Sequence, residues 1–305
     1  KDTAKRLWFI YPIFTFVETM LLWAGEMKLF DALCHSLTTM ATGGYSTKQA
    51  SIAYWNSPYI HYVITVFMFL AGTNFTLAYF GMHGQFRKIW RNEEFRWYLG
   101  FIGGFTLLVT LGLFFTSGSG LEPAFRNAIF QVVSIITTTG YATADYEKWP
   151  AMSQLILLLC MFIGASAGST GGGMKCLRIM LCFKYCYREL FSLIHPRAVS
   201  PIKIGGKTVP DDVMRSVVGF LALYMGLFAM STVALAGLGV DFRTSFSAIA
   251  ASIGNIGPGF GLVGPVENYA HIPYLVKCLL IWCMLLGRLE IFTVIILVVP
   301  EFWRK

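Results

Sequence analysis

The sequence predicts an all-α polytopic membrane protein built from repeated units, and three observations support this fold class. Of the 305 residues, 56% are hydrophobic and only 13% are charged, which is unlike a soluble globular domain. Several apolar runs are long enough to cross a bilayer, which takes roughly 20 helical residues. A short polar loop also recurs between them, as TTMATGGYST at residues 38–47 and SIITTTGYATADYEKWP at residues 134–150.

Six apolar runs are expected to form membrane crossings. They lie at residues 7–25, 58–80, 97–116, 151–192, 213–238 and 272–299. A shorter apolar segment follows the first, third and fifth run, and each begins near an acid, Asp31, Glu122 or Asp241, as helices commonly do. Each segment is too short to cross a bilayer and ends in a glycine-rich loop. We therefore expect three re-entrant helices.

The three glycine-rich loops align at Gly44, Gly140 and Gly257. Upstream of each glycine, apolar residues recur in steps of four and three, as on one face of a helix. The second and third segments also share an arginine preceded by phenylalanine, Arg126 and Arg243, at the same distance from the glycine. The repeated unit is therefore a crossing, a re-entrant helix, a glycine loop and a second crossing.

This repeat divides the chain into three units. They are residues 1–82 with a loop at 40–47, residues 97–192 with a loop at 137–143, and residues 213–305 with a loop at 254–259. Connecting loops at 83–96 and 193–212 lie in basic segments, and both are expected on the cytoplasmic side. Seventeen of the 24 Lys and Arg residues fall on that side, which also places both ends of this chain there.

Several other classes of function are disfavoured. The net charge of +8 is explained by bases on one membrane face, so no nucleic-acid partner is expected. The seven cysteines contain no C-x-x-C pair and are interpreted as buried thiols. The five histidines are scattered, and no paired acids lie in a re-entrant loop. We expect no enzyme activity and no catalytic residues, and a polytopic membrane enzyme is only a remote alternative.

The loops are candidate cation sites. Non-helical backbone at membrane depth is tolerated only where protein buries it or where it lines a water-filled cavity. Converging carbonyl oxygens can replace the water shell of a monovalent cation, and a helix C-terminus favours positive charge. The candidate ion-binding residues are Thr42, Gly43, Gly44, Thr138, Thr139, Gly140, Asn255, Ile256 and Gly257. The last loop has Asn-Ile-Gly-Pro, so we expect an asymmetric ring.

Thr-Thr-Gly-Tyr at 138–141 resembles the Thr-Val-Gly-Tyr filter of potassium channels, and the repeated unit is similar to that of the Trk/Ktr/HKT superfamily. MATGGYST, TTTGYATADY and SIGNIGPGFG, in this order and spacing, resemble the second, third and fourth filters of the TrkH-type family. The resemblance covers essentially the whole chain and implies a pseudo-fourfold pore of four repeats. The first filter is not found in these 305 residues, so they alone are not expected to form a closed four-sided pore.

The resemblance implies potassium uptake across the inner (plasma) membrane through a carbonyl-lined selectivity filter. K⁺ is then the transported ion, and no organic cofactor is expected on this chain. A homodimer and a cytoplasmic nucleotide-binding regulatory subunit of the TrkA type are also implied. A potassium symporter coupled to H⁺ or Na⁺ remains an alternative on the same fold. A reversal potential that follows only the potassium gradient would favour a channel.

The segment GASAGSTGGG at residues 164–173 is predicted to break the second crossing of its unit, because five glycines in ten residues disfavour a helix. It lacks the lysine of a phosphate loop, and small-residue helix packing is the alternative. The resemblance implies that this segment lies across the permeation path as a gate. Its gate residues are Gly168, Gly171, Gly172 and Gly173.

Arg288 is the remaining candidate for the gate. It lies about fifteen residues into the last apolar run, or roughly 22 Å at the α-helical rise, past the midplane of the bilayer. A charge at such depth is functional by default, although it can also hold helices together by pairing with a carbonyl or carboxylate. The resemblance places an arginine here beside the gate loop, where it would repel a permeating cation.

Overall fold

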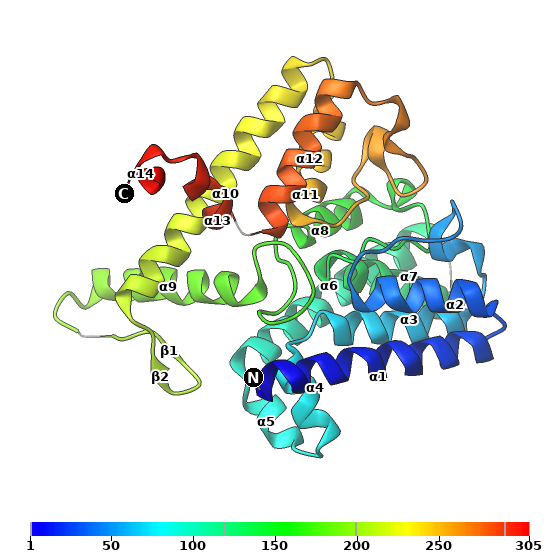
Figure 1. Ribbon diagram of the computed structural model, residues 1–305, viewed down its shortest axis with the longest axis horizontal. Helices are drawn as coiled ribbons and strands as arrows, with labels where there is room; N and C mark the ends of the chain where they lie inside the picture. The colour runs from blue at the N-terminus through cyan, green and yellow to red at the C-terminus, as the bar shows by residue number, and fades with distance from the viewer. Residues whose placement is uncertain (1, 119, 199, 290, 305) are drawn as a thin grey trace.

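The computed structural model describes residues 2–118, 120–198, 200–289 and 291–304, and its helices follow one another in three units (Figure 1). The first unit contains α1 (Asp2–Ala24), α2 (Leu29–Met40), α3 (Pro58–Ala71) and α4 (Phe75–Met82), and α5 (Phe86–Arg91) leads to the second. The second unit contains α6 (Glu93–Ser117), α7 (Leu121–Ile136), α8 (Ala151–Cys160) and α9 (Cys176–Ile194). The third contains α10 (Asp211–Gly237), α11 (Phe242–Gly254), α12 (Tyr274–Arg288), α13 (Ile291–Ile295) and α14 (Pro300–Trp303).

Short elements fill the connections. An antiparallel hairpin of β1 (Lys203–Ile204) and β2 (Lys207–Thr208) lies between α9 and α10, with Lys203 opposite Thr208. Single 3-10 turns are formed by Ser51–Tyr54, Tyr146–Lys148, Gly261–Val263, Tyr269–His271 and Ile296–Val298. The regular secondary structure of the described residues is therefore almost entirely helical, and the predicted all-α class is confirmed.

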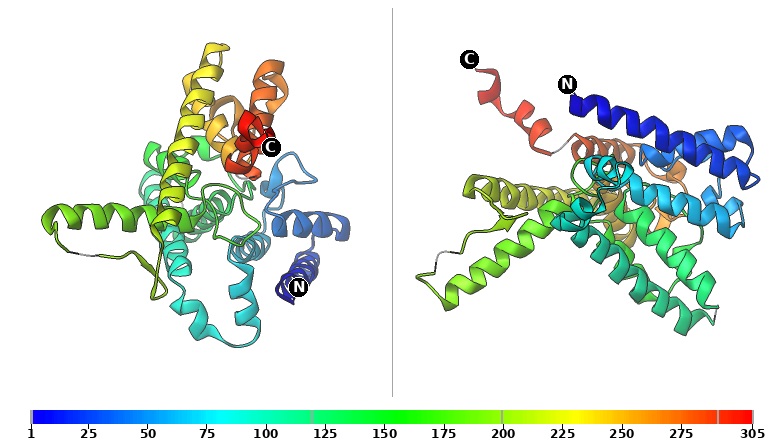
Figure 2. Two further views of the ribbon diagram at one scale, coloured as in Figure 1. Left: turned by 60° about the vertical axis from the view of Figure 1, so that its left-hand side comes forward. Right: turned by 90° about the horizontal axis from the view of Figure 1, so that it is seen from below.

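Each of the re-entrant helices α2, α7 and α11 packs between the helices that precede and follow it in its own unit. Helix α2 contacts α1 and α3, α7 contacts α6 and α8, and α11 contacts α10 and α12. The three units surround the segment that joins α8 to α9, which Figure 2 shows in green near the middle of its left panel. One apolar core joins them, with fully buried Ile64, Ile136 and Ile249 contributed by different units.

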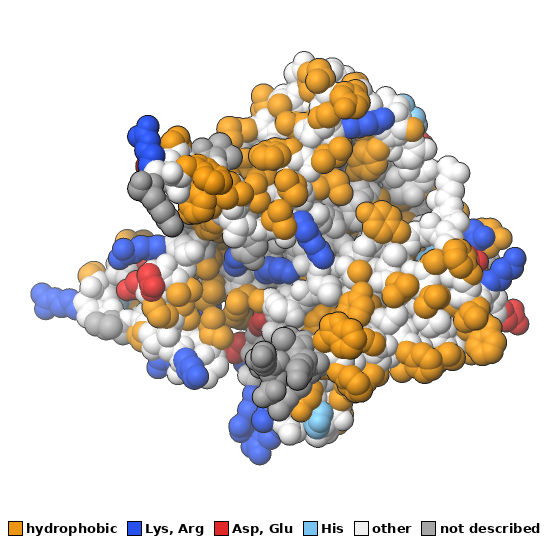
Figure 3. All heavy atoms as spheres, viewed as in Figure 1, with side chains coloured by type: hydrophobic (Ala, Val, Ile, Leu, Met, Phe, Trp, Pro, Cys, Tyr) orange, Lys and Arg blue, Asp and Glu red, His pale blue; other side chains and the backbone are white. Residues whose placement is uncertain are grey.

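Within the described part of the chain, two helices are individually long and apolar enough to cross a bilayer, over Glu93–Thr116 and Asp211–Gly237. Apolar side chains also cover the outside of the molecule, as lipid contact requires. Figure 3 shows many of them over α1 and α12. The exposed ones include Trp8, Phe16 and Trp23 of α1 and Leu275, Ile281 and Trp282 of α12.

The apolar run 58–80 does not form the continuous crossing that was predicted. Helices α3 and α4 meet at a bend of 111°, and the break falls at 72–74. A side chain at Gly72 would place its Cβ 2.6 Å from the Tyr98 hydroxyl, so the backbone passes close to α6. Asn74 then starts α4, because its side chain accepts a hydrogen bond from the Thr76 amide at 2.8 Å.

Two other predicted crossings are also interrupted. The run 151–192 has helix only up to Cys160 and again from Cys176, so the predicted break is present and wider than 164–173. The run 272–299 is divided after Arg288, where α12 ends. The segment 83–96 is largely helical rather than a loop, since α5 lies within it and Asn92 caps α6.

The prediction of buried thiols is only partly correct. All seven cysteines are free, but Cys186 and Cys278 are exposed. Cys160, Cys176 and Cys283 are buried as expected.

Candidate ion pathway

The three re-entrant helices end in the same hydrogen-bonded turn. In each, one amide donates to the carbonyl three residues earlier, and the next amide donates to the carbonyl five residues earlier. The second bond joins Gly43 to Thr38 at 2.8 Å, Thr139 to Ser134 at 2.9 Å and Ile256 to Ala251 at 2.8 Å. This pairing is the Schellman motif, which satisfies the last carbonyls of a helix and reverses the chain. All three loops therefore leave their helices in the same way.

The backbone of the loops also repeats. Thr42, Thr138 and Asn255 have left-handed φ values of 51°, 59° and 55°, and two residues later Gly44, Gly140 and Gly257 have φ values of 62°, 84° and 109°. The residue between them has a negative φ in each loop. Alternating signs of φ turn successive carbonyls to one side of the chain, whereas an ordinary strand alternates them. Each loop can thus present a row of oxygens to an ion.

Two of these positions carry a β-branched residue in a conformation that such residues rarely adopt. Thr42 and Thr138 are both buried, so their strain is held by surrounding contacts. Residues kept in such conformations cluster at functional sites.

Neighbouring loops lie in direct contact through their glycines. A Cβ added to Gly44 would lie 1.8 Å from the Thr139 carbonyl oxygen, and one added to Gly140 would lie 1.9 Å from that of Ile256. Only glycine allows these approaches. Around Gly257 no described atom lies within 4 Å of the same position. The loops therefore stand side by side in chain order, and the ring is open beyond the third.

Hydroxyl groups of the re-entrant helices bond to backbone carbonyls of the first two loops. Thr38 Oγ1 donates to the Tyr45 carbonyl at 3.0 Å, and the equivalent Ser134 Oγ donates to the Tyr141 carbonyl at 2.7 Å. The Tyr141 hydroxyl is also 2.6 Å from Thr38 Oγ1 and donates to the His35 carbonyl at 3.1 Å. The second loop is thereby fixed to helix α2 of the first unit.

The segment between α8 and α9 contacts the start of the first two loops. Thr170 donates its hydroxyl hydrogen to the Met40 carbonyl at 2.9 Å, and Thr42 Oγ1 donates to the Thr170 carbonyl at 2.9 Å. The Gly172 amide donates to Thr138 Oγ1 at 2.6 Å. Both strained threonines therefore bond directly to this segment.

The third unit is equally close to this segment. A Cβ on Gly172 would lie 2.8 Å from the carbonyl oxygen of Gly254, the last residue of α11. In the second unit, a Cβ on Gly171 would lie 2.9 Å from the carbonyl oxygen of Thr137, just after α7. Gly168 and Gly173 have left-handed φ values of 76° and 72°. The glycines proposed from sequence thus permit both the path of the segment and its contact with the helix ends.

Two polar residues that the sequence reasoning did not select fix the other end of the segment. Glu94 Oε1 accepts a hydrogen bond from the Ala167 amide at 2.6 Å, and Asn74 Nδ2 donates to the Ala167 carbonyl at 2.7 Å. Asn74 could have been noticed as a polar interruption of the run 58–80. Glu94, which precedes the run 97–116, is 7% exposed, and nothing local in the sequence distinguishes it from the exposed acids.

Arg288 reaches the same segment from α12. Its Nη1 donates to the Thr170 carbonyl at 2.9 Å, so this oxygen accepts from both Thr42 and Arg288. The expected position inside a continuous helix is wrong, because Arg288 is the last residue of α12. Gly287 allows α12 to approach α11 closely, because a Cβ at this position would lie 1.9 Å from the Ile253 carbonyl oxygen.

Three units of this kind, each with a re-entrant helix that ends in a left-handed loop, define a pore-loop class of membrane protein. The whole chain, residues 1–305, matches the family model for TrkH, described as a cation transport protein. The Trk system potassium uptake proteins TrkH of Salmonella typhimurium and Vibrio parahaemolyticus are 41% identical over 307 residues and 42% identical over 309 residues. The chain belongs to the TrkH family.

The fold agrees with a solved structure. The crystal structure of the potassium transporter TrkH from Vibrio parahaemolyticus superimposes with a TM-score of 0.93 at 40% identity, covering 99% of this chain and 65% of that chain. This chain is matched over its full length by the two curated relatives but spans 63% of theirs. The resemblance of the chain to the TrkH-type family is thus confirmed for family and fold, and the assignment of the three loops as filters stays a prediction.

Proposed function

We propose that this chain serves potassium uptake by supplying three sides of a four-sided selectivity filter. The observation that carries the proposal is the left-handed loop found three times, with the glycine of one loop packed against a carbonyl of the next. The relatives of this chain are named as potassium uptake proteins, which favours K⁺ as the transported ion.

In this proposal the backbone carbonyls of the nine loop residues replace the hydration shell of K⁺. The helices α2, α7 and α11 direct their C-terminal ends at the loops, and each end carries a partial negative charge that favours a cation. Glycine keeps the inner surface free of side chains. Transport needs no chemical change in a substrate, so we assign no enzyme activity.

The gate in this proposal is the segment 164–173. It is bonded to Thr42 and Thr138 at the starts of two loops, and Arg288 adds a fixed positive charge at the same place. A cation leaving the filter would meet the backbone of this segment and then the guanidinium. Breaking the bonds at Thr170 would free both obstructions together, because Thr42 and Arg288 share its carbonyl oxygen.

The setting of the protein is part of the same proposal. We place it in the inner (plasma) membrane as a homodimer, with both ends of this chain and the bases around α5, α9 and the β-hairpin on the cytoplasmic side. A nucleotide-binding regulatory subunit of the TrkA type would bind there.

The test is a measurement of reversal potential with the full-length protein in a planar bilayer. A reversal potential that follows only the potassium gradient supports a channel. A shift when a proton or sodium gradient is imposed at constant potassium would instead identify the ion-coupled symporter. No potassium current, with or without the regulatory subunit, would contradict both.

A further inference from the structure

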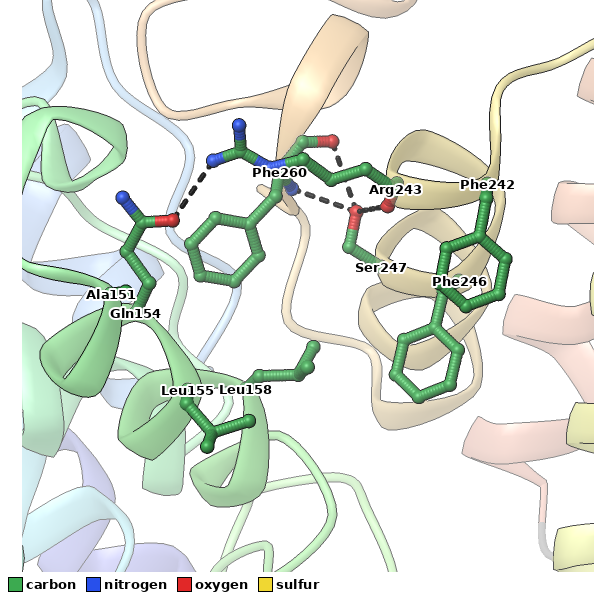
Figure 4. Close-up of a pocket in the computed structure, with 9 residues that line it drawn as sticks. All are labelled: Ala151, Gln154, Leu155, Leu158, Phe242, Arg243, Phe246, Ser247 and Phe260. Carbon is green, nitrogen blue, oxygen red and sulfur yellow. Dashed lines mark hydrogen bonds between the residues drawn. The ribbon is translucent and has the colours of Figure 1, made fainter.

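A cavity of about 340 Å³ lies between α8 of the second unit and α11 of the third (Figure 4). Its apolar wall includes Leu155, Leu158 and Phe246, and Arg243, Gln154 and Phe260 also line it. This volume is within the range of small-molecule sites. The open side of the filter lies beyond the third loop, whereas this cavity lies between the second and third units.

The cavity is polar at one end and apolar at the other. Arg243 Nη2 donates to Gln154 Oε1 at 3.0 Å, and Figure 4 shows this pair at one end, with Leu155 and Leu158 at the other. Helix α11 begins on the face opposite the basic β-hairpin, because α10 runs from that hairpin to the start of α11. The bond between Gln154 and Arg243 places the start of α8 beside it. Leu158 follows Gln154 by one turn, which is about 6 Å farther into the membrane.

Arg243 differs from its counterpart in the preceding unit. Arg126 pairs with Glu122 on its own helix at 3.3 Å, and the Arg126 side chain is only 13% exposed. The position four residues before Arg243 is Gly239, so α11 offers no acid there. The Arg243 side chain is 52% exposed at the rim of the cavity and forms a long ion pair with Glu147, with 3.8 Å between Nη2 and Oε1.

That carboxylate is already engaged in the third loop. Glu147 Oε1 accepts a hydrogen bond from the Gly261 amide. Arg243 has five N–H donors in a planar fork, and the Gln154 amide oxygen takes one of them. A half-exposed guanidinium above an apolar cavity at the membrane boundary is complementary to a phosphate that carries a hydrocarbon chain.

We propose that this cavity binds one acyl chain of an anionic glycerophospholipid, whose phosphate is held by Arg243. A lipid fits this site better than a free phosphate, because a free phosphate would leave the apolar wall of the cavity without contact. The bound chain would lie between α8, which leads into the segment 164–173, and α11, which ends at the third loop. The lipid would thus fix the spacing between the gate and a filter helix.

The test is lipid retention by the full-length protein, measured by native mass spectrometry after delipidation. Phosphatidylglycerol and phosphatidylcholine with the same acyl chains are added separately. Arg243→Gln is compared with Lys148→Gln, which removes an exposed charge nearby that does not line the cavity. Leu155→Trp, which fills the cavity, is compared with Leu159→Trp, an exposed leucine one turn away that is outside the lining.

We expect Arg243→Gln to reduce phosphatidylglycerol retention about tenfold, as for loss of a charge-assisted hydrogen bond, while Lys148→Gln has no effect. Leu155→Trp should reduce retention of both lipids, and Leu159→Trp of neither. If Leu155→Trp does not fold, Phe242→Ala removes a 74% exposed part of the wall and should weaken both lipids.

Equal phosphatidylglycerol retention by Arg243→Gln and Lys148→Gln would overturn the role of Arg243. Equal retention by the two tryptophan variants would overturn the cavity as the site. A change of oligomeric mass in Leu155→Trp with unchanged lipid binding would show that a second copy of the chain covers this face, and would also contradict the proposal.

Discussion

Gly140→Ala is expected to disturb the proposed filter by two separate effects. Gly140 has a φ of 84°, and a side chain in the left-handed region costs roughly 1–2 kcal/mol. The new Cβ would also lie 1.9 Å from the Ile256 carbonyl oxygen. The new Cβ and the Ile256 carbonyl oxygen must move apart by about 1 Å to reach even the shortest usual contact distance. A close-packed protein accommodates such a movement poorly. The carbonyl that moves is one proposed to bind the ion.

Gly239→Ala provides the matched control. Gly239 lies between α10 and α11 with a φ of 89°, and no described atom lies within 4 Å of the position that its Cβ would occupy. This variant therefore has the same backbone strain without the collision. We expect it to lower the free energy of unfolding by about 1–2 kcal/mol and to leave ion selectivity unchanged.

The assay is the ratio of potassium to sodium flux into liposomes that contain the full-length protein, with thermal unfolding measured in parallel. Gly140→Ala should lower this ratio, because the displaced carbonyls no longer fit the dehydrated potassium ion. If both alanine variants keep the flux ratio of the unaltered protein, the contact between loops does not set selectivity and the reasoning fails.

Three further outcomes are expected. Arg288→Ala should raise the basal potassium flux per folded molecule by up to about a hundredfold, if the charge adds about 3 kcal/mol to the barrier for a cation ~6 Å away at an effective dielectric near 20. Arg288→Lys should raise the flux less, because it keeps the charge. Equal or reduced flux in the alanine variant would contradict an electrostatic barrier at Arg288. Deletion of residues 171–173 removes the bond from Gly172 to Thr138 and should raise the open probability in single-channel recordings, whereas unchanged regulated flux would indicate a packing role. Asp241→Ala should lower the free energy of unfolding by about 1 kcal/mol at neutral pH, because Asp241 caps α11. Hydrogen bonds from Thr244 lower the pKa of Asp241, so the stabilisation is lost as the pH falls through that lowered pKa. The thermal stabilities of the two proteins should converge only at that low pH.

The repeated unit could be predicted because its signals are local. Apolar periodicity located α2, α7 and α11, and the aligned Gly44, Gly140 and Gly257 all have left-handed backbone. Glycine at these positions reflects a conformation and a close approach that no other residue allows, so its spacing is visible without any knowledge of neighbouring units.

The interruptions of the crossings could not be predicted in the same way. The run 58–80 is mostly apolar around its bend apart from Asn74 and its neighbours, and the bend depends on the distant Ala167 and Tyr98. Hydropathy indicates whether a segment is apolar enough to lie in lipid. It contains no information on backbone N–H and C=O groups that are hydrogen-bonded by another segment of the chain. The position of Arg288 at a helix end was missed for the same reason.

The roles assigned to the loop and gate residues remain predictions. The structure places Thr42, Thr138 and Arg288 around the same segment, and sequence reasoning had selected all three. Their bonds to 170 and 172 were not foreseeable, because they join residues more than thirty positions apart in the chain.

The segment between α8 and α9 comes from the second unit alone, although the helix ends above it come from all three. If this segment is the gate, as proposed, one set of bonds must break to open it, and opening is one kinetic event rather than the concerted movement of several equivalent helices. Closed times in recordings from one protomer should therefore follow a single exponential at fixed conditions. In the proposed homodimer, each protomer would have its own gate segment, and the two should open in independent and equal current steps.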